Sequence, residues 1–450
     1  MKKQIFILTF VLIVSSTGLS QSFFSPLIGN LPSVADARSL AVGLSGWGDG
    51  GSASALLTNS ALLGHSKQKL SLIAGLNAFS IKEKRSFPVQ DSYGDFLADN
   101  TYVLNQNWFP DFQVGINTKP LARIRLAMLL NHTNLSDFQY EEEVRGSLYG
   151  EYNRDPLVGY NRLSNRHSVF NASLGMAFNP WQSLWLGAAL NLIAPDFSEQ
   201  KYEIQVIKPS DYQSSDHTIS YVVKPKFESA ITGNLGMTFD VTKHLSLAIS
   251  YQLPYKTVQK GGLLYLVNDT TQTLPVLAID SVFTIAKVTN HQPGELRFGL
   301  CLKPVNIIPT QLFFEIVYQN WKDVTTKYQF RSDVNPNDIP NNFSDVPIPY
   351  RNVTKIHLGI EHIFFSGVPL RFGFYHDPNP INAEMNRNWF TAGTAYQFGN
   401  FNLEISGAFT TCDYKYHDLF PIAVEKRVEF DTVQESYLIG MATLRYNFNL

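Results

Sequence analysis

Two arginines, Arg297 and Arg371, stand in the same Leu-Arg-Phe-Gly context. In an extended chain, successive side chains point to opposite faces, so each arginine lies opposite its bulky apolar neighbours. A cation on an enclosed, apolar face can hold a carboxylate through charge-assisted hydrogen bonds. The alternative is that the arginines pair with acids on the same face, such as Glu295 or Glu361, and brace the structure. Charged side chains on the inner face of a barrel are ordinary, which favours bracing for either arginine alone.

A second candidate for chemistry is the pair His357 and Glu361, which share one face of the same extended segment. Neither a third metal ligand nor a nucleophile is identifiable beside them, so packing on that face is the favoured interpretation. The sequence holds no GxSxG, HExxH or Cys-x-x-Cys motif. We therefore predict no enzyme activity, no cofactor and no metal site. Triads can be assembled across distant strands, so a barrel hydrolase stays open as a further hypothesis.

The segment GWGDGG, residues 46–51, formally fits the GxGxxG pattern. A dinucleotide site needs a strand before this pattern and a helix after it. Neither is evident here. Gly46 and Gly48 are therefore assigned to a glycine-rich segment that packs closely against other backbone.

Two apolar groups fall in segments expected to be long loops. Trp108, Phe109 and Phe112 end the first long loop, and an apolar run lies in the fourth. An exposed run of this kind needs burial or a ligand, so a hydrophobic capture site is one interpretation. The alternatives are that the loops pack on one another, or that Trp108 belongs to an interfacial aromatic girdle. The apolar run consists of Leu263, Leu264, Tyr265, Leu266 and Val267.

The composition of the 450-residue chain points to the elements that hold these residues. Charged residues make up 16% and aromatic residues 13%, and the formal net charge is -2. This charge leaves no basic footprint for nucleic acid. No apolar run long enough for a membrane-spanning helix follows the N-terminal leader. A closed sheet is the other way to satisfy backbone groups in lipid, so a membrane β-barrel is predicted.

The pattern of strands and turns supports this class. From residue 68 onward, about 14 strands with an alternating apolar pattern can be counted. Short turns and long polar loops connect them alternately. Such alternation places both termini on one side and predicts periplasmic turns and extracellular loops. The two cysteines, Cys301 and Cys412, fall on predicted strands and are expected to be unpaired. The predicted long loops are residues 82–110, 136–166, 195–217, 255–280, 331–350, 376–388 and 414–426.

The N-terminal region divides into two parts before the strands begin. Residues 1–20 have a basic start, an apolar stretch and small residues before Gln21, as in a signal peptide. Residues 37–64 are rich in Gly, Ala and Ser and almost free of charge. The predicted organisation is a signal peptide at 1–20, an N-terminal hatch or plug at 21–67, and an all-β, antiparallel transmembrane barrel at 68–450.

Several segments carry a resemblance to known proteins. Residues 55–63 (ALLTNSALL) are similar to an Asn-Pro-Ala segment at the end of a hatch. Residues 293–299 (PGELRFG) are similar to a strand that begins with Pro and carries Leu-Arg-x-Gly. Residues 356–361, 369–375 and 377–381 (IHLGIE, PLRFGFY and DPNPI) are similar to paired late strands and an Asp-Pro-x-Pro loop. In order and spacing, these segments resemble the FadL-type family of outer-membrane transporters for long-chain fatty acids and hydrocarbons.

The match in the hatch rests on Asn59 and Ala61, whereas Ser60 stands where the family usually has Pro. The resemblance implies a 14-stranded barrel with an N-terminal hatch. It also implies an apolar extracellular groove, a deeper pocket and lateral exit through a gap in the wall.

Two functions of different classes follow as hypotheses. The first is passive uptake of hydrophobic compounds, such as long-chain fatty acids or related hydrocarbons, across a bacterial outer membrane. The second is a scaffold or shuttle in a protein secretion system, a role that related barrels fill. The expected partners are a hydrophobic small molecule, outer-membrane lipids and lipopolysaccharide, with no nucleic acid, and the barrel is expected to be a monomer. Charged groups at residues 82–85 and 141–143 could contact lipopolysaccharide through divalent ions or phosphates, but a solvated loop is the favoured interpretation.

Overall fold

The computed structural model describes residues 36–90, 93, 95–145, 157–206, 219–266, 281–330, 350–365, 367–416 and 431–448. The expected signal peptide, residues 21–35 of the expected hatch and Val267 lie outside the described residues. Among the described residues, no helix is long and apolar enough to cross a membrane.

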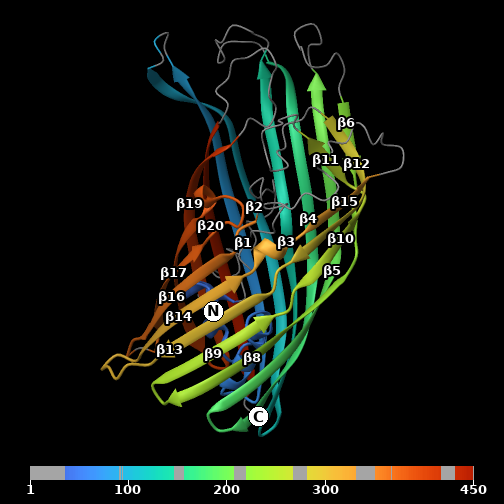
Figure 1. The fold of residues 1–450 in the computed structure, drawn as a ribbon. Coiled ribbons are helices and arrows are strands. Elements are labelled where there is room, and N and C mark those ends of the chain that lie inside the picture. The colour runs from blue at the N-terminus through green and yellow to red at the C-terminus, as the bar shows by residue number, and fades with distance from the viewer. Residues whose placement is uncertain are drawn as a thin grey trace, which may run out of the picture.

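The described chain is dominated by antiparallel strands (Figure 1). The first nine are β1 (Leu70–Gln90), β2 (Phe96–Leu121), β3 (Ile124–Arg145), β4 (Leu157–Trp181), β5 (Leu184–Val206), β6 (Ile219–Val223), β7 (Lys226–Phe227), β8 (Ala230–Thr242) and β9 (Leu245–Gln252). The next six are β10 (Tyr255–Lys260), β11 (Leu263–Leu266), β12 (Ser281–Gln292), β13 (Glu295–Leu302), β14 (Thr310–Gln319) and β15 (Thr326–Phe330). The last five are β16 (Val353–Ile363), β17 (Pro369–Asp377), β18 (Arg387–Phe398), β19 (Phe401–Tyr416) and β20 (Asp431–Phe448).

Fourteen of these strands close into a barrel, which confirms the predicted fold class. Each strand pairs with its neighbours around the ring, and β1 pairs with β20 from Leu70↔Phe448 to Ser86↔Thr432. Closure removes the exposed sheet edges that an open sheet would present to lipid. The order around the ring is β1, β2, β3, β4, β5, β8, β9, β13, β14, β16, β17, β18, β19 and β20.

The outer surface of the barrel is apolar where the predicted alternation places bulky residues. On β13, Leu296 and Phe298 are exposed whereas Glu295 and Gly299 are buried. Most strands of the ring contribute large exposed side chains in the same way, and a soluble protein would expose no such continuous surface. Examples are Leu76, Val114, Met128, Leu174, Leu190, Leu235, Phe298, Phe372, Phe390, Ile405 and Leu438. This belt fits the hydrocarbon layer of a membrane.

The predicted boundaries of the first three long loops are wrong. The β1–β2 pairing continues to Gln90↔Phe96, the β3–β4 pairing to Arg145↔Leu157, and the β4–β5 pairing to Gly159↔Val206. Much of residues 82–110, 136–166 and 195–217 is therefore strand. The predicted boundaries followed the apolar alternation, which marks contact with lipid. Backbone pairing continues above the lipid, where both faces can be polar.

The two apolar groups assigned to loops also lie on strands. Trp108 and Phe109 belong to β2, opposite Ser80 and Phe79 of β1. The run at Leu263–Leu266 is strand β11, which pairs with β12. Cys301 on β13 and Cys412 on β19 are buried and free, as predicted.

Inside the ring, in the lower half of the barrel, lies the plug (Figure 1), whose described residues form four short helices. These are α3 (Ala37–Ala41) and the 3-10 helices η1 (Gly46–Asp49), η2 (Ala53–Leu57) and η3 (Ser60–His65). Two further 3-10 turns, η5 (Trp321–Asp323) and η6 (Ala383–Met385), lie after β14 and before β18. Leu40, Leu56 and Leu63 are fully buried against the wall. The plug is thus an apolar core of the barrel as well as an obstruction.

Candidate functional site

Three helices of the plug begin at a polar side chain that caps the first turn. Asp36 accepts a hydrogen bond from the backbone N of Ser39 at 2.9 Å. Asn59 accepts one from the backbone N of Ala61 at 3.0 Å, and Ser52 caps η2 in the same manner. Such caps satisfy backbone N–H groups that a helix start leaves free. The local sequence therefore sets where each short helix begins.

Inward-facing glycines of the wall bring the plug backbone into direct contact with the strands. A Cβ added to Gly236 would lie 1.9 Å from Oδ1 of Asn59, and one on Gly373 would lie 2.1 Å from N of Gly43. These wall positions require glycine, because any side chain there would collide with the plug. The same close approach to the plug occurs at Gly115, Gly175, Gly187, Gly299, Gly359 and Gly393.

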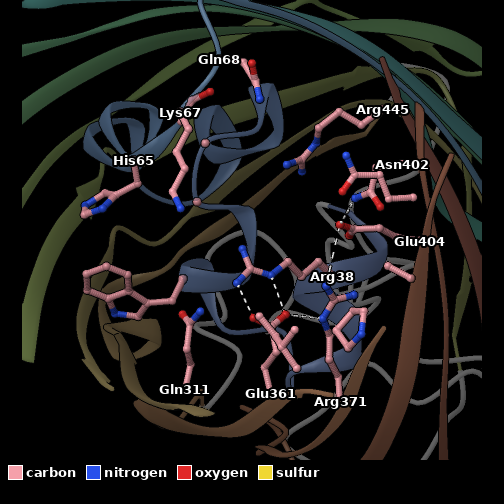
Figure 2. Close-up of a pocket in the computed structure, with 18 of the residues that line it drawn as sticks. Arg38, His65, Lys67, Gln68, Gln311, Glu361, Arg371, Asn402, Glu404 and Arg445 are labelled. Atoms are coloured by element: carbon pink, nitrogen blue, oxygen red, sulfur yellow. Dashed lines mark hydrogen bonds and ion pairs between the residues drawn. The ribbon is translucent and has the colours of Figure 1, made fainter. Parts of the chain in front are cut away.

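A network of charges ties the plug to the wall on its lower side (Figure 2). Arg38 of α3 donates from Nε to Oε2 of Glu361 at 3.1 Å and from Nη2 to Oε1 at 2.9 Å. Arg371 of β17 donates from Nε to the same Glu361, and its Nη2 lies 3.8 Å from Glu404 of β19. A two-point contact of this kind fixes the orientation as well as the distance of the pair.

A second network lies on the upper side of the plug. Arg297 Nη1 donates to Oε1 of Glu315 at 2.9 Å, and the Arg297 guanidinium also pairs with Glu295. The other oxygen of Glu315 accepts the backbone N–H of Gly46 at 3.0 Å. Arg297 and Arg371 therefore both face inward, and each pairs with a carboxylate named in the bracing alternative.

Uncharged groups complete the attachment. His357 Nδ1 donates to the carbonyl of Gly43 at 2.7 Å, and Asn59 Nδ2 donates to the carbonyl of Ile249 at 3.2 Å. The backbone N of Ser60 donates to Oδ1 of Asn234 at 3.3 Å. A proline has no N–H, so Ser60 gains a contact that the usual residue of the resembled family could not make.

One acidic residue of the plug is buried with little compensation. Asp49 is fully buried; its Oδ2 accepts a hydrogen bond from Thr58 Oγ1 at 3.0 Å, and its Oδ1 has no partner among the described residues. Burial, followed by the nearby charge of Asp36, raises the pKa of Asp49 well above its ordinary value of 3.8. The protonated acid is therefore favoured inside the plug.

A cavity of about 280 Å³ lies on the upper side of the plug. Its wall combines apolar groups such as Leu57, Tyr255 and Trp321 with polar groups such as Arg297 and His357. One side of the wall continues into a row of aromatic rings, because Tyr375 stacks on His357 at 5.5 Å and on Trp389 at 5.4 Å between ring centroids. The cavity can therefore surround an apolar body and contact a polar end.

The wall beside this cavity is interrupted on four neighbouring strands of the ring. The ladder stops before β8, after β9, before β13 and after β14, and the chain resumes in an upper sheet that includes β7, β10, β12 and β15. Pro254 and Pro293 stand in two of these breaks, and Pro225 lies just before β7. Proline cannot donate to a ladder, so it ends strand pairing at these points. We call these interruptions the break row.

A second discontinuity separates β2 from β3. Their pairing ends at Gln113↔Asn131, above which β2 pairs with β1 and β3 with β4. His132 lies at this fork, with Nδ1 3.3 Å from Asp111 and Nε2 3.4 Å from Asp196, and its ring stacks on Phe112. Side chains from three strands thus meet where the backbone pairing stops.

The lower side of the plug opens into a larger cavity of about 550 Å³, which we call the vestibule (Figure 2). Residues at the short-turn ends of the strands line it, including Lys303, Pro369 and Asn402. In the predicted orientation this side faces the periplasm. Arg371 lines the vestibule and Arg297 lines the upper cavity, so the plug stands between the two arginines that the sequence suggested for one pocket.

The remaining predicted residues are placed as follows. Trp108 is exposed on β2. Phe109 and Leu263–Leu266 are described through their backbone pairing alone. Gly46 and Asn59 hold the plug through hydrogen bonds, and Gly48 packs against the backbone of Ser39. Among the described residues, no group of three or more His, Cys, Asp or Glu side chains is arranged to hold a metal ion.

Sequence inspection missed several residues that the structure brings to the plug. Arg38 and Asp49 are the charged residues of the otherwise uncharged segment 37–64, and this isolation was an available signal. Glu315, which accepts a hydrogen bond from the plug, and Glu404, which lies 3.8 Å from Arg371, carry no such signal, since they resemble other inward-facing acids of the strands.

Comparison with known proteins identifies the type of barrel. No family model matches the sequence, and a search of curated proteins finds no significant match. Solved structures do match: a FadL homologue from Pseudomonas aeruginosa has a TM-score of 0.61 at 11% identity over 93% of this chain and 99% of that chain. The chain has the FadL-type fold.

Two further structures agree with this assignment. The toluene transporter TodX from Pseudomonas putida has a TM-score of 0.58 at 14% identity and covers 92% of this chain and 98% of its own. The toluene transporter TbuX from Ralstonia pickettii has a TM-score of 0.53 at 14% identity, with 92% and 98% covered. With its FadL-type fold and its apolar outer belt, the chain is an outer-membrane β-barrel.

Proposed function

We propose that this barrel is a channel for passive uptake of hydrophobic compounds, specifically long-chain fatty acids or related hydrocarbons. The observation that supports it best is the plug, which separates an upper cavity from a lower vestibule inside a FadL-type barrel. A lumen packed with Leu40, Leu56 and Leu63 does not suit an open aqueous pore.

The proposed path begins at the extracellular end. An apolar compound would be captured near Trp108, Phe109 and the Leu263–Leu266 strand, then enter the upper cavity beside Arg297. Burial of each methylene contributes about 0.8 kcal/mol, so a long acyl chain can be held by area alone. The polar end would add orientation more than affinity.

We propose the break row as the lateral route that the family resemblance implies. Gln252, Tyr255, Gln292 and Trp321 line the upper cavity and also flank three of the breaks. Replacing Pro254 and Pro293 together by Val would restore two N–H donors and is expected to lower the uptake rate. Pro309→Val, near the short-turn end, is the control. An unchanged rate in the double variant would rule this position out.

The outer surface supports two further parts of the proposal. Lys82 and Lys84 lie on the upper half of β1 and are less buried than the neighbouring Ile81 and Glu83. They are suited to phosphate groups of lipopolysaccharide. The ring closes within one chain, so we propose that the barrel works as a monomer.

The test is native mass spectrometry of the protein purified from outer membranes, followed by identification of its extracted lipids. A stoichiometric fatty acid or hydrocarbon, weakened by Arg297→Ala or by deletion of residues 263–267, is the expected result. Proteoliposomes should then take up that compound faster than empty vesicles. An empty barrel that fails to bind added fatty acid would contradict the fatty-acid proposal, and co-purification with secretion proteins would favour the scaffold alternative.

A further inference from the structure

The vestibule carries an excess of positive charge in a chain whose net charge is negative. Its lining holds five cationic side chains against the two carboxylates of Glu361 and Glu404. The formal net charge of the whole chain is -2. The cationic side chains are those of Arg38, Lys67, Lys303, Arg371 and Arg445.

Several donors of this group are unused. Arg371 is 4% exposed, and its Nη1 has no hydrogen-bond partner among the described residues. Nε of Arg445 likewise has no hydrogen-bond partner among the described residues, and Nη2 of Arg445 lies 3.5 Å from Asp36. Within the described part of the chain, the ammonium groups of Lys67 and Lys303 have no ion-pair partner. Buried donors without acceptors are costly, and an anion in the vestibule would satisfy them.

Apolar surface lies beside these charges. Trp47 and Phe313 line the same cavity, together with Ile363. A volume of about 550 Å³ falls in the range of small-molecule sites. Inorganic anions would leave the apolar part of the lining uncovered, whereas a molecule with both a carboxylate and an alkyl chain would cover it.

We infer that the vestibule is a binding site for amphipathic carboxylates on the periplasmic side of the plug. The carboxylate is held by Arg371 and the lysines at the rim, and the alkyl chain lies along Trp47 and Phe313. This inference rests on the proposed function, because it assigns the vestibule to those molecules of the transported compound that pass the plug instead of leaving through the break row. It adds that acids are retained there, whereas neutral hydrocarbons are not.

The same site is linked to the attachment of the plug. An incoming carboxylate competes with Glu361 for Arg38, which holds the plug to β16, and for Arg371 on the neighbouring strand β17. Coupling between two binding events is reciprocal. Glu361→Gln, which weakens the plug contact and removes a competing charge, should therefore tighten carboxylate binding.

The experiment uses quenching of tryptophan fluorescence in the full-length protein in mild detergent, titrated with 11-bromoundecanoate or 11-bromoundecanol. The expected result is saturable quenching by the carboxylate that is largely lost in Trp47→Phe. The Lys67→Ala, Lys303→Ala double variant should weaken it about tenfold, since two charge-assisted contacts are removed. Both lysines lie outside the plug contacts described above. Lys243→Ala, on an exposed turn outside the vestibule, should bind like the wild type.

Three outcomes would overturn the inference. These are equal affinity for the alcohol and the carboxylate, displacement of the carboxylate by equimolar inorganic phosphate, and wild-type binding by the double lysine variant. Uptake of a neutral hydrocarbon into proteoliposomes separates the two proposals. Uptake without carboxylate binding would overturn this inference alone, whereas failure of neutral and acidic compounds to enter would overturn the proposed function.

Discussion

Arg38 in the plug and Glu361 in β16 meet through two hydrogen bonds, at 3.1 and 2.9 Å. The side chains are 17% and 3% exposed, so water weakens the pair little. Glu361 also receives Arg371, and the three groups join the plug to two strands of the wall. This contact is the clearest point at which a small change should free the plug.

Replacing Arg38 by Met should loosen the plug while keeping much of the apolar length of the side chain. Breaking a buried ion pair costs about 3 kcal/mol, and here Arg371 still partly compensates Glu361. The expected result is larger and more frequent ion conductance in planar bilayers. Lys243→Met, on an exposed turn, is the control. Conductance equal to the wild type would show that the apolar contacts alone hold the plug.

Gly373→Ala should displace the plug, because the new Cβ would lie 2.1 Å from the backbone N of Gly43. The expected loss is about 1–3 kcal/mol, typical of overpacking. Gly440→Ala is a matched control, because a Cβ there meets nothing within 4 Å. Thermal unfolding in detergent should separate the two variants. Equal melting temperatures would refute the role assigned to the wall glycines.

Ser60→Pro restores the residue usual in the resembled family. Ser60 is the first residue of η3, a position that accepts proline readily. The substitution removes the N–H that bonds to Asn234, which is buried, so we expect a loss of about 1 kcal/mol. Ser60→Ala keeps the N–H and serves as the control. A proline variant more stable than the wild type would mean that the bond to Asn234 contributes nothing.

Asp49→Asn should stabilise the protein at neutral pH. The pKa of Asp49 is raised by burial, so the folded state takes up a proton more readily than the unfolded state. The stabilisation of the folded state that comes from this proton is fully present below pH 3.8. It is lost as the pH rises through the pKa of Asp49 in the folded state. The variant should therefore gain stability over the wild type at pH 8 and little at pH 4. Melting temperatures at both pH values test this, with the exposed Asp323→Asn as control. A gain of the same size at both pH values would contradict it.

Much of the fold follows from local patterns. Alternation with a period of two decided which face of each strand meets lipid, and hence that Arg297 and Arg371 point inward. The small residues of segment 37–64 indicated close packing. The break row had a signal in Pro254 and Pro293, because each removes a ladder donor.

Which residues meet across the lumen was decided by the tertiary structure. Arg38 and Glu361 are 323 residues apart in the chain, and Gly46 and Glu315 are 269 apart. Alternation assigns a side chain to a face, but its height in the barrel depends on the register of every strand between. The plug sequence has no regular repeat that would assign its side chains to a face. The sequence alone therefore determined that the two arginines point inward and that a segment of small residues packs closely. Closure of the ring placed Arg297 above the plug and Arg371 below it, because only the paired strands set their relative heights.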